Sequence, residues 1–548
     1  MKPNFKTYSL LVISDLHLSE GIHPHSKKYS LKEDFFFDRE FARFLEHYQN
    51  PGKWGGKKWH LIINGDMLDF LQVTAYRDAP AGLHRPSRHP EYGLDCGEAE
   101  SVYKLGKIVE GHREFFQALA EFVAGGNLLS VIKGNHDAEF HYPAVRRAFL
   151  EQLQNAYDST PTAEAVAESG ASRIKSEMVQ FPDWFYYEEG LLWVEHGNQY
   201  DGVNVFPYFL SPLLPKAPGR SAERANEIDL PWGSLFVRYL FNKIEMVEPF
   251  ADNIKPQTLF IRWLFRKHPM TALKFAVLDG GFMLRKIRRA WTPAKPGAYA
   301  TREQEHHARL RGLADEWGIS EADLRYLDGL RSKSLLTETS SLGWRIARAI
   351  LCRPRVLQPL LIAVAILIAI GVVVAASPLF VAVIPSVIRK LLWERWRLIQ
   401  SAITVVQWIV FPIVVVAAVM FVRWLFRGEA KKETDNLAIQ SRMIAKRLGV
   451  QAVLMGHTHD ADQMSIGDRG EEYFNTGTWT KVFSEEERLI RDDIEFVFVQ
   501  GLRRNGGLQL KLMEWDDGAR EPRLLKLFED PGDERRKQRG RDVGKQAG

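Results

Sequence analysis

Five short clusters of polar side chains in this sequence carry residue types that bind metal ions. The candidate ligands are Asp15, His17, Asp66, Asn135, His196, His457 and His459. Imidazole, carboxylate and amide groups suit Mn²⁺, with Fe or Zn²⁺ as alternatives, better than ions that seek thiolates. The set is too large for one ion. Two ions about 3.5–4 Å apart, bridged by a carboxylate, would use all seven side chains.

The spacing within the clusters fits this interpretation. In the pattern Asp15-x-His17, two alternate side chains at a strand end project toward one ion, and Gly456-His457-x-His459 serves two ions from one loop. A glycine stands beside most clusters and lets the backbone turn tightly there. These glycines are Gly65, Gly134, Gly197 and Gly456.

Each cluster directly follows a short apolar run. These runs are Tyr8–Ile13, Leu61–Ile63, Leu128–Ile132, Leu191–Val194 and Ala452–Met455. Bounded apolar runs of this length predict strands that are buried on both faces. Helical patterns lie between several of them, which predicts a layered α/β fold with its ligands at the carboxyl ends of the strands. The predicted helices are Phe35–Tyr48, Val102–Phe122 and Leu437–Leu448, the last with Asp435 as its N-cap and Gly449 as its stop.

The five clusters, taken in order, resemble the motifs of the calcineurin-like metallophosphoesterases. The matching blocks are Asp15-x-His17, Gly65-Asp66-x-x-Asp69, Gly134-Asn135-His136-Asp137, His196-Gly197 and Gly456-His457-Thr458-His459. The resemblance covers roughly residues 7–201 and 435–482. It implies an αββα metallophosphoesterase sandwich that hydrolyses phosphoesters with two metal ions and an activated water.

The resemblance also implies a role for each residue. Asp15, His17 and His459 would hold the first ion. Asn135, His196 and His457 would hold the second, and Asp66 would bridge the two. His136 would be the catalytic residue that protonates the leaving oxygen or stabilises the phosphoryl charge, positioned by Asp137. Asp69 and Asp201 would support the site or contact the substrate, and the turn Asn475–Thr478 would pack beneath it.

About 260 residues separate the fourth and fifth clusters, so an insertion must interrupt the core. We expect a first core part over 1–205, a helical basic insertion over 206–354, a transmembrane hairpin over 355–428, a second core part over 429–529 and a disordered charged tail over 530–548. Between Leu230 and Lys295 there are 12 Lys or Arg against 4 Asp or Glu. Cations interleaved with large apolar residues there favour a basic amphipathic helix on an anionic membrane surface, or alternatively a basic helical cap.

The hairpin prediction depends on two stretches without charged residues, Leu357–Ile388 and Leu398–Val422. Each is long enough to cross the roughly 20-residue span of a bilayer. A buried helical pair or a re-entrant hairpin are the alternatives. Both flanks must build one core, and they carry more cations than the loop between the two stretches, so we expect a multi-pass protein of the inner (cytoplasmic) membrane with its core facing the cytoplasm. The start of the chain shows no export signal, which agrees with this orientation.

Sequence similarity around three of the clusters narrows the class of substrate that we expect. Ser14–Leu18, His196 with Asp201 and the Gly456–His459 block are similar to the UDP-2,3-diacylglucosamine pyrophosphatase branch of the family, which acts on a lipid-linked pyrophosphate. That branch typically has arginine where this chain has His136, and its insertion is far shorter. The expectation is therefore a metallophosphoesterase that acts on a membrane-associated or lipid-linked phosphate. A nuclease or cyclic-nucleotide phosphodiesterase and a non-catalytic membrane scaffold are the alternatives.

Composition excludes several other classes of protein. The 548 residues carry 73 Lys or Arg and 68 Asp or Glu, and the net charge of +5 does not by itself indicate a nucleic-acid partner, so we expect none. A chain that is 45% hydrophobic and 26% charged is globular rather than disordered or fibrous. The two cysteines, Cys96 and Cys352, exclude a disulfide framework.

Overall fold

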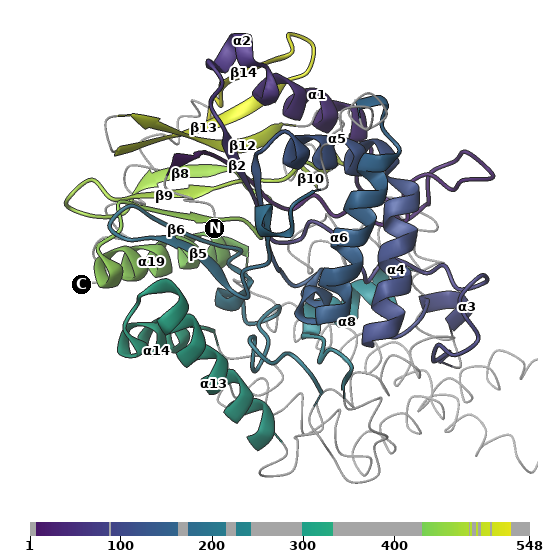
Figure 1. Ribbon diagram of the computed structural model, residues 1–548. Helices are drawn as coiled ribbons and strands as arrows, with labels where there is room; N and C mark the ends of the chain where they lie inside the picture. The colour runs from purple at the N-terminus through teal and green to yellow at the C-terminus, as the bar shows by residue number, and fades with distance from the viewer. Residues whose placement is uncertain are drawn as a thin grey trace, which may run out of the picture. The chain divides into compact units, whose positions relative to one another are not determined.

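Two β-sheets form the framework of the structure, which is a computed structural model (Figure 1). It describes residues 7–86, 89–162, 174–214, 226–242, 299–332, 430–481, 483–484, 489–490, 495–504 and 507–527. All of these residues belong to one compact unit. The second unit of the chain, 280–293 with 338–429, lies outside the described residues.

The first sheet has seven strands in the order β14-β13-β12-β1-β2-β3-β4. They are β1 (Ser9–Ile13), β2 (Trp59–Asn64), β3 (Leu128–Ile132), β4 (Val179–Gln180), β12 (Phe496–Arg504), β13 (Gly507–Asp516) and β14 (Glu521–Leu524). Strands β1 to β4 run parallel, and β12 pairs antiparallel with β1. Because parallel strands end at one edge of a sheet, the loops after β1, β2 and β3 emerge side by side.

The second sheet has five strands in the order β5-β6-β7-β9-β8. They are β5 (Phe185–Glu188), β6 (Leu192–Glu195), β7 (Ala452–Met455), β8 (Asp462–Ser465) and β9 (Glu472–Asn475). Strands β6, β7 and β9 run parallel. A separate two-stranded ribbon pairs β10 (Phe483–Ser484) with β11 (Leu489–Ile490).

One hydrophobic core lies between the two sheets. Leu10 and Val12 of β1 pack in the same cluster as Val194 of β6 and Leu454 of β7, and all four side chains are fully buried. The alternate residues of β1, such as Leu11, are equally buried on the opposite face. An uninterrupted apolar strand thus faces the second sheet on one side and helices on the other, as such strands require.

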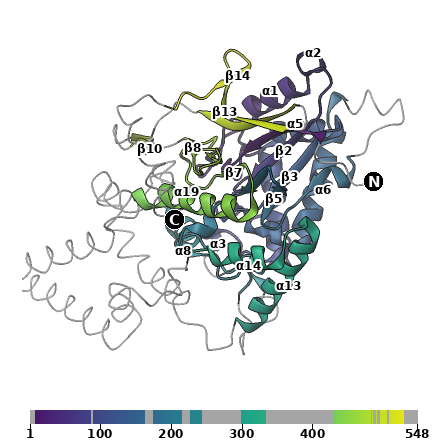
Figure 2. The ribbon, with the colours of Figure 1, turned by 90° about the vertical axis from the view of Figure 1, so that its left-hand side faces the viewer.

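Helices cover the outer faces of both sheets. Helices α1 (Asp38–Gln49), α4 (Glu98–Gly111), α5 (Arg113–Ala124) and α6 (Pro143–Asp158) pack on one another in a layer beside the first sheet (Figure 1). Phe44 of α1, for example, packs on Phe498 of β12 with ring centroids 5.0 Å apart. Helix α19 (Ala430–Leu448) lies against β7 and β9 of the second sheet (Figure 2). The mixed α/β architecture expected from the sequence is therefore confirmed.

All five predicted strands are present, with ends shifted by at most two residues. They do not form one sheet, however: β1, β2 and β3 belong to the first, whereas β6 and β7 belong to the second. Two helix predictions were also inaccurate. Asp435 is not an N-cap, because the helix-forming residues before it extend α19 back to Ala430, although Gly449 ends the helix in a left-handed conformation, as expected.

The helix predicted over Val102–Phe122 is broken at His112 into α4 and α5. The side chain of His112 is buried, with Nδ1 3.1 Å from Asp38 Oδ1 and Nε2 3.2 Å from Glu33 Oε2. Burial lowers the pKa of His112, but the two carboxylates outweigh this and raise the pKa to about 10. The break thus places a cation between two buried carboxylates, an interaction that the helical pattern does not reveal.

This arrangement predicts a stability that declines at alkaline pH. Because the folded pKa of about 10 exceeds the unfolded value of 6.5, the contribution of His112 is complete below pH 6.5 and is lost as pH rises through 10. We expect His112→Gln to lower the free energy of unfolding by about 3–5 kcal/mol at pH 6 and to flatten this decline. Urea unfolding at pH 6, 8 and 10 measures both effects. His47→Gln is the control, since burial lowers the pKa of His47, and parallel pH profiles for wild type and His112→Gln would refute the prediction.

The described parts of the insertion lie in the same compact unit as the core. They include α8 (Trp232–Phe236), α13 (Ala300–Trp317) and α14 (Glu321–Gly329). Among the helices that the structure describes, none combines the length and the apolar character needed to cross a membrane. The expected hairpin at 355–428, the tail at 530–548 and all but residues 230–242 of the basic segment 230–295, for which we expected an amphipathic helix, lie outside the described residues.

Candidate metal centre

The loops that follow the strands hold their ligands in an uncommon backbone conformation. Seven non-glycine residues of the described chain have positive φ, and five of them are predicted ligands. These are Asp15, His17, Asp66, His457 and His459, with φ between 51° and 71°. Positive φ is disfavoured in residues that carry a Cβ, and such strain gathers at functional sites. The sharp turns bring side chains from separate strands toward one point.

The first group of ligands comprises Asp15, His17 and His459. The Nε2 atoms of His17 and His459 lie 3.1 Å apart, and Asp15 Oδ1 is 3.3 Å from Nε2 of His459 and 3.9 Å from Nε2 of His17. All three donor atoms therefore converge although residues 17 and 459 are 442 positions apart. Such convergence of two imidazole nitrogens on a carboxylate oxygen is what a single ion requires.

The turn Asn475–Thr478 after β9, which we expected to pack beneath the site, contacts Asp15 and its neighbour Ser14. Ser14 Oγ donates to Asp15 Oδ2 at 2.5 Å and lies 2.6 Å from Thr476 Oγ1. Thr478 Oγ1 donates to the carbonyl oxygen of Asp15 at 2.6 Å, and the backbone N–H of His457 donates to Asp15 Oδ2 at 3.0 Å. These bonds occupy Oδ2 and leave Oδ1 directed to the histidines.

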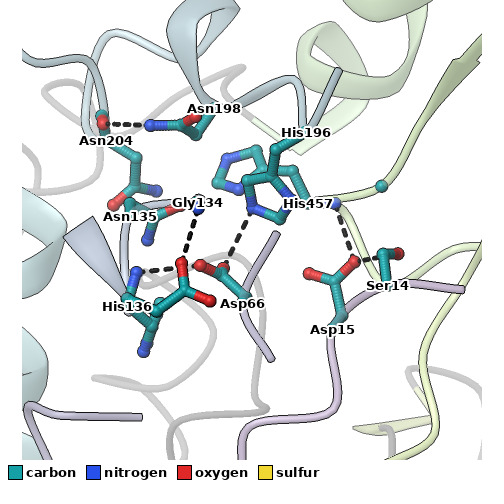
Figure 3. A network of polar contacts seen from close by, with 12 residues as sticks. Ser14, Asp15, Asp66, Gly134, Asn135, His136, His196, Asn198, Asn204 and His457 are labelled. Carbon is teal, nitrogen blue, oxygen red and sulfur yellow. Dashed lines mark hydrogen bonds and ion pairs between the residues drawn. The ribbon is translucent and has the colours of Figure 1, made fainter. Parts of the chain in front are cut away.

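The second group comprises Asp66, His196 and His457 (Figure 3). His196 Nδ1 donates to the carbonyl oxygen of Asn64 at 2.8 Å, which leaves Nε2, 3.0 Å from Asp66 Oδ2, as the nitrogen that could bind an ion once its proton is displaced. His457 Nε2 lies 3.1 Å from Asp201 Oδ2. Burial raises the pKa of Asp201, but the hydrogen bond from His457 outweighs it and keeps the pKa low, so Asp201 is an acceptor. His457 therefore donates through Nε2 and presents Nδ1 as its ligand atom.

Asn135 supplies a buried amide oxygen beside this group. Its Oδ1 accepts no hydrogen bond within the described part of the chain, although the residue is only 2% exposed. A buried acceptor without a donor is costly, and a cation would compensate it. The close approach of the loops also requires glycine: a Cβ on Gly134 would lie 2.1 Å from Asp66 Oδ1, and one on Gly65 would lie 2.4 Å from the His196 ring.

His136 is paired with Asp69 and not with Asp137. His136 Nδ1 lies 2.5 Å from Asp69 Oδ2. Burial would raise the pKa of Asp69, but His136 and His17 hold it well below its usual range, so Nδ1 of His136 donates to an ionised carboxylate. Asp137, which we expected to position His136, accepts the backbone N–H groups of Gly134 and Met67 at 2.6 and 2.9 Å and so acts on the loop that carries His136.

The electrostatics of the centre favour a bound cation. Burial raises the pKa values of Asp15 and Asp66, but the surrounding histidines outweigh it and hold both carboxyls in the ionised form. Burial lowers the pKa of His196, whereas Asp66 and Asp15 raise it to about 9. The positive charge of the buried histidines here balances the negative charge of the buried carboxylates. The donor set of imidazoles, carboxylates and one amide fits divalent ions such as Mn²⁺, Fe²⁺ or Zn²⁺.

The structure thus brings the seven predicted ligands into neighbouring groups and places His136 beside them. His17 and His136 are in edge contact, with ring centroids 4.5 Å apart, and the groups Asp15–His17–His459 and His17–Asp69–His136 share His17. Sequence reasoning missed Ser14 as a partner of Asp15 and Asn204 as a partner of Asp201, because neither polar residue carries a spacing signal. A further group of possible ligands, His84, Asp95 and Glu227, shares no residue with the others, and its Asp95 already pairs with Arg238.

Comparison with known protein families, with curated proteins and with solved structures finds no match to this chain.

Proposed function

We propose that this protein is a dinuclear metal-dependent phosphoester hydrolase of the calcineurin-like metallophosphoesterase type, built on an αββα sandwich. The observation that carries the proposal is the convergence of ligands from five strand ends around Asp66. That carboxylate has one oxygen 3.0 Å from His196 Nε2, and its other oxygen accepts the backbone N–H of His136 at 2.8 Å. The influence of both His17 and His196 on its pKa supports a position between the two ligand groups.

The proposed ligand assignment follows the two groups. Asp15 Oδ1 with Nε2 of His17 and His459 would hold one ion, and Asn135 Oδ1 with His196 Nε2 and His457 Nδ1 would hold the other. Asp66 would serve both. Bound divalent ions would supply Lewis acidity and would make water a nucleophile at neutral pH.

The protein's own residues supply the remaining chemistry. With Nδ1 donating to Asp69, His136 would use Nε2 to reach the leaving oxygen. The protonated ring can donate that hydrogen to the leaving oxygen, as a general acid within hydrogen-bond reach does. The Asp69 carboxylate orients the imidazole and stabilises its cation. Asp137 accepts the backbone N–H groups of Gly134 and Met67. These two bonds fix the loop that carries Asn135 and His136.

The proposed substrate is an amphiphilic phosphate or pyrophosphate at a membrane surface. The support is in the sequence: two long stretches without charge follow a basic, aromatic-rich segment within the insertion. An attached chain of that composition would hold the centre where lipid-linked phosphates are concentrated. The membrane hairpin itself is part of this proposal.

An assay of product release by the full-length chain tests the proposed function; it is read by chromatography, because a cyclic nucleotide or a pyrophosphate diester yields a phosphomonoester and no inorganic phosphate. We expect a chelator to abolish product release and Mn²⁺ to restore it, because the ions held by the seven ligands would activate the attacking water. A lipid-linked pyrophosphate in vesicles should be cleaved at least tenfold faster than soluble p-nitrophenyl phosphate or a cyclic nucleotide. Equal rates with and without vesicles would refute the lipid-linked substrate, and cleavage of single-stranded DNA or RNA instead would favour a nuclease. Release that is insensitive to the chelator would refute the metal centre.

A further inference from the structure

The loop 198–204 connects the second group of ligands to the insertion. It begins two residues after His196 and carries Asp201, whose Oδ2 faces His457 Nε2 at 3.1 Å. Two groups of the same loop hold the Asp201 carboxylate: the backbone N–H of Val203 donates to Oδ1 at 2.8 Å, and Asn204 Nδ2 donates to Oδ2 at 2.6 Å. The orientation of His457 therefore depends on the conformation of this loop.

Helix α8, in the described part of the insertion, packs directly on this loop. The backbone N–H of Gly233 donates to the carbonyl oxygen of Val203 at 3.0 Å. The fit is close, because a Cβ on Gly233 would lie only 1.9 Å from Asn204 Oδ1. The adjacent residue, Ser234, donates its hydroxyl to the carbonyl oxygen of Asn135 at 3.2 Å. One short helix thus contacts both a predicted ligand and the loop that orients another.

The segment after α14 holds the same loop from its other end. The backbone N–H of Ser332 donates to the carbonyl oxygen of Gln199 at 2.9 Å, and its hydroxyl donates to that of Tyr200 at 2.6 Å. Residues on both sides of the undescribed stretch 243–298 therefore fix the loop 198–204.

The first group of ligands is supported in a different way. The bonds to Asp15 come from Ser14, Thr478 and the backbone of His457, all of which belong to the core. Asp15 is thus held by residues of the core, whereas Asn135 and the loop that carries Asp201 contact the insertion as well.

We propose that helix α8, through Asn204 and Asp201, sets the affinity of the second ion position, so that the insertion determines whether the centre holds one ion or two. This inference rests on the proposed dinuclear centre. A carboxylate that accepts from a ligating histidine fixes the ring and raises its basicity, and loss of such a partner typically weakens metal binding 10–100-fold. Asp201 is accordingly a positioning residue for His457.

Gly233→Ala is the most selective test of this chain of contacts. The added methyl must displace the flexible amide end of Asn204, which breaks its bond to Asp201, whereas alanine itself favours the helix. We expect the variant to keep the affinity of the first Mn²⁺ and to lose roughly tenfold or more in the affinity of the second. Equilibrium dialysis gives the two affinities, and the exchange-coupled dinuclear signal in electron paramagnetic resonance reports the second ion directly.

Asn204→Ala provides a second variant without the steric change, and it should weaken the same ion position. The double variant should bind the second ion no more weakly than Asn204→Ala alone, because both substitutions remove the same hydrogen bond, that from Asn204 to Asp201. Gly312→Ala is the matched control: it makes the same substitution in α13, where a Cβ meets only an arginine nitrogen at 3.7 Å. It should bind both ions as the wild type does.

Three outcomes would overturn the inference. Wild-type affinities in both Gly233→Ala and Asn204→Ala would show that the contacts do not reach His457. Equal weakening of both ion positions would show a general disturbance of the centre. A wild-type chain that never binds two ions would refute the proposed function and this inference with it, whereas two-ion binding by wild type with unaltered variants would refute the inference alone.

Discussion

Asp66→Asn is expected to lower phosphoester hydrolysis by about 10³-fold or more. The amide keeps the shape of the side chain and its bond from the backbone N–H of His136, but it removes the negative charge that the ligand groups share. Since metal-ion catalysis supplies several kcal/mol and each 1.36 kcal/mol is tenfold in rate, the loss should be of this order. Metal content after dialysis and kcat for phosphate release measure the two consequences together.

The control for this change is Asp517→Asn. Asp517 is a part-exposed carboxylate that pairs with Arg43 of α1 through Oδ2 at 2.6 Å. The substitution makes the same chemical change away from the predicted ligands and should leave activity and metal content at the wild-type level. A folded Asp66→Asn protein with wild-type turnover would rule out a catalytic centre at Asp66.

His136→Gln is expected to reduce kcat by about 10²–10⁴-fold for esters with a poor leaving group. The reduction should be much smaller for a p-nitrophenyl ester, because nitrophenolate departs without a proton. Asp69→Asn should show the same dependence on the leaving group in weaker form, since Asp69 holds Nδ1 of His136 at 2.5 Å. Rates for alkyl and p-nitrophenyl phosphates, measured side by side, give this ratio.

Asp137→Asn tests whether Asp137 or Asp69 orients the His136 ring. Its oxygens accept backbone N–H groups of Gly134 and Met67, so the substitution should lower the free energy of unfolding by about 1–3 kcal/mol. The ratio of alkyl to p-nitrophenyl rates should stay at the wild-type value. A ratio that changes in Asp137→Asn but not in Asp69→Asn would contradict the assignment.

Much of the site could be predicted because its signals are local. Each predicted ligand directly follows an apolar run, and a parallel strand delivers whatever follows it to the sheet edge. Asp15 and His17 after β1, and His457 and His459 after β7, are therefore where the sequence places them. The core of β1 was predictable for the same reason, since the four consecutive apolar residues Leu10–Ile13 favour burial on both faces.

The remaining features depend on contacts between distant segments. Asp69 and Asp137 both lie near the predicted ligands in the sequence. Asp137 accepts backbone N–H groups in the folded chain, and Asp69 is the carboxylate that accepts the hydrogen bond from His136. The pair Asp201–His457 spans 256 residues. The break at His112 depends on Glu33 and Asp38 from another part of the chain, and the division of five similar strands between two sheets has no local signal.

The pairing of β1 with β12 has a consequence for biosynthesis. Leu11 lies opposite Gln500, so one edge of the innermost strand stays without its neighbour until nearly the whole polypeptide has left the ribosome. At about 5–20 residues per second, the nascent chain would wait roughly 25–100 s for that neighbour. An exposed strand edge invites misassembly, so a helper that shields nascent chains would matter more here than for a domain that closes early. Polypeptides that terminate prematurely within the insertion would contain neither the complete sheet nor His457 and His459.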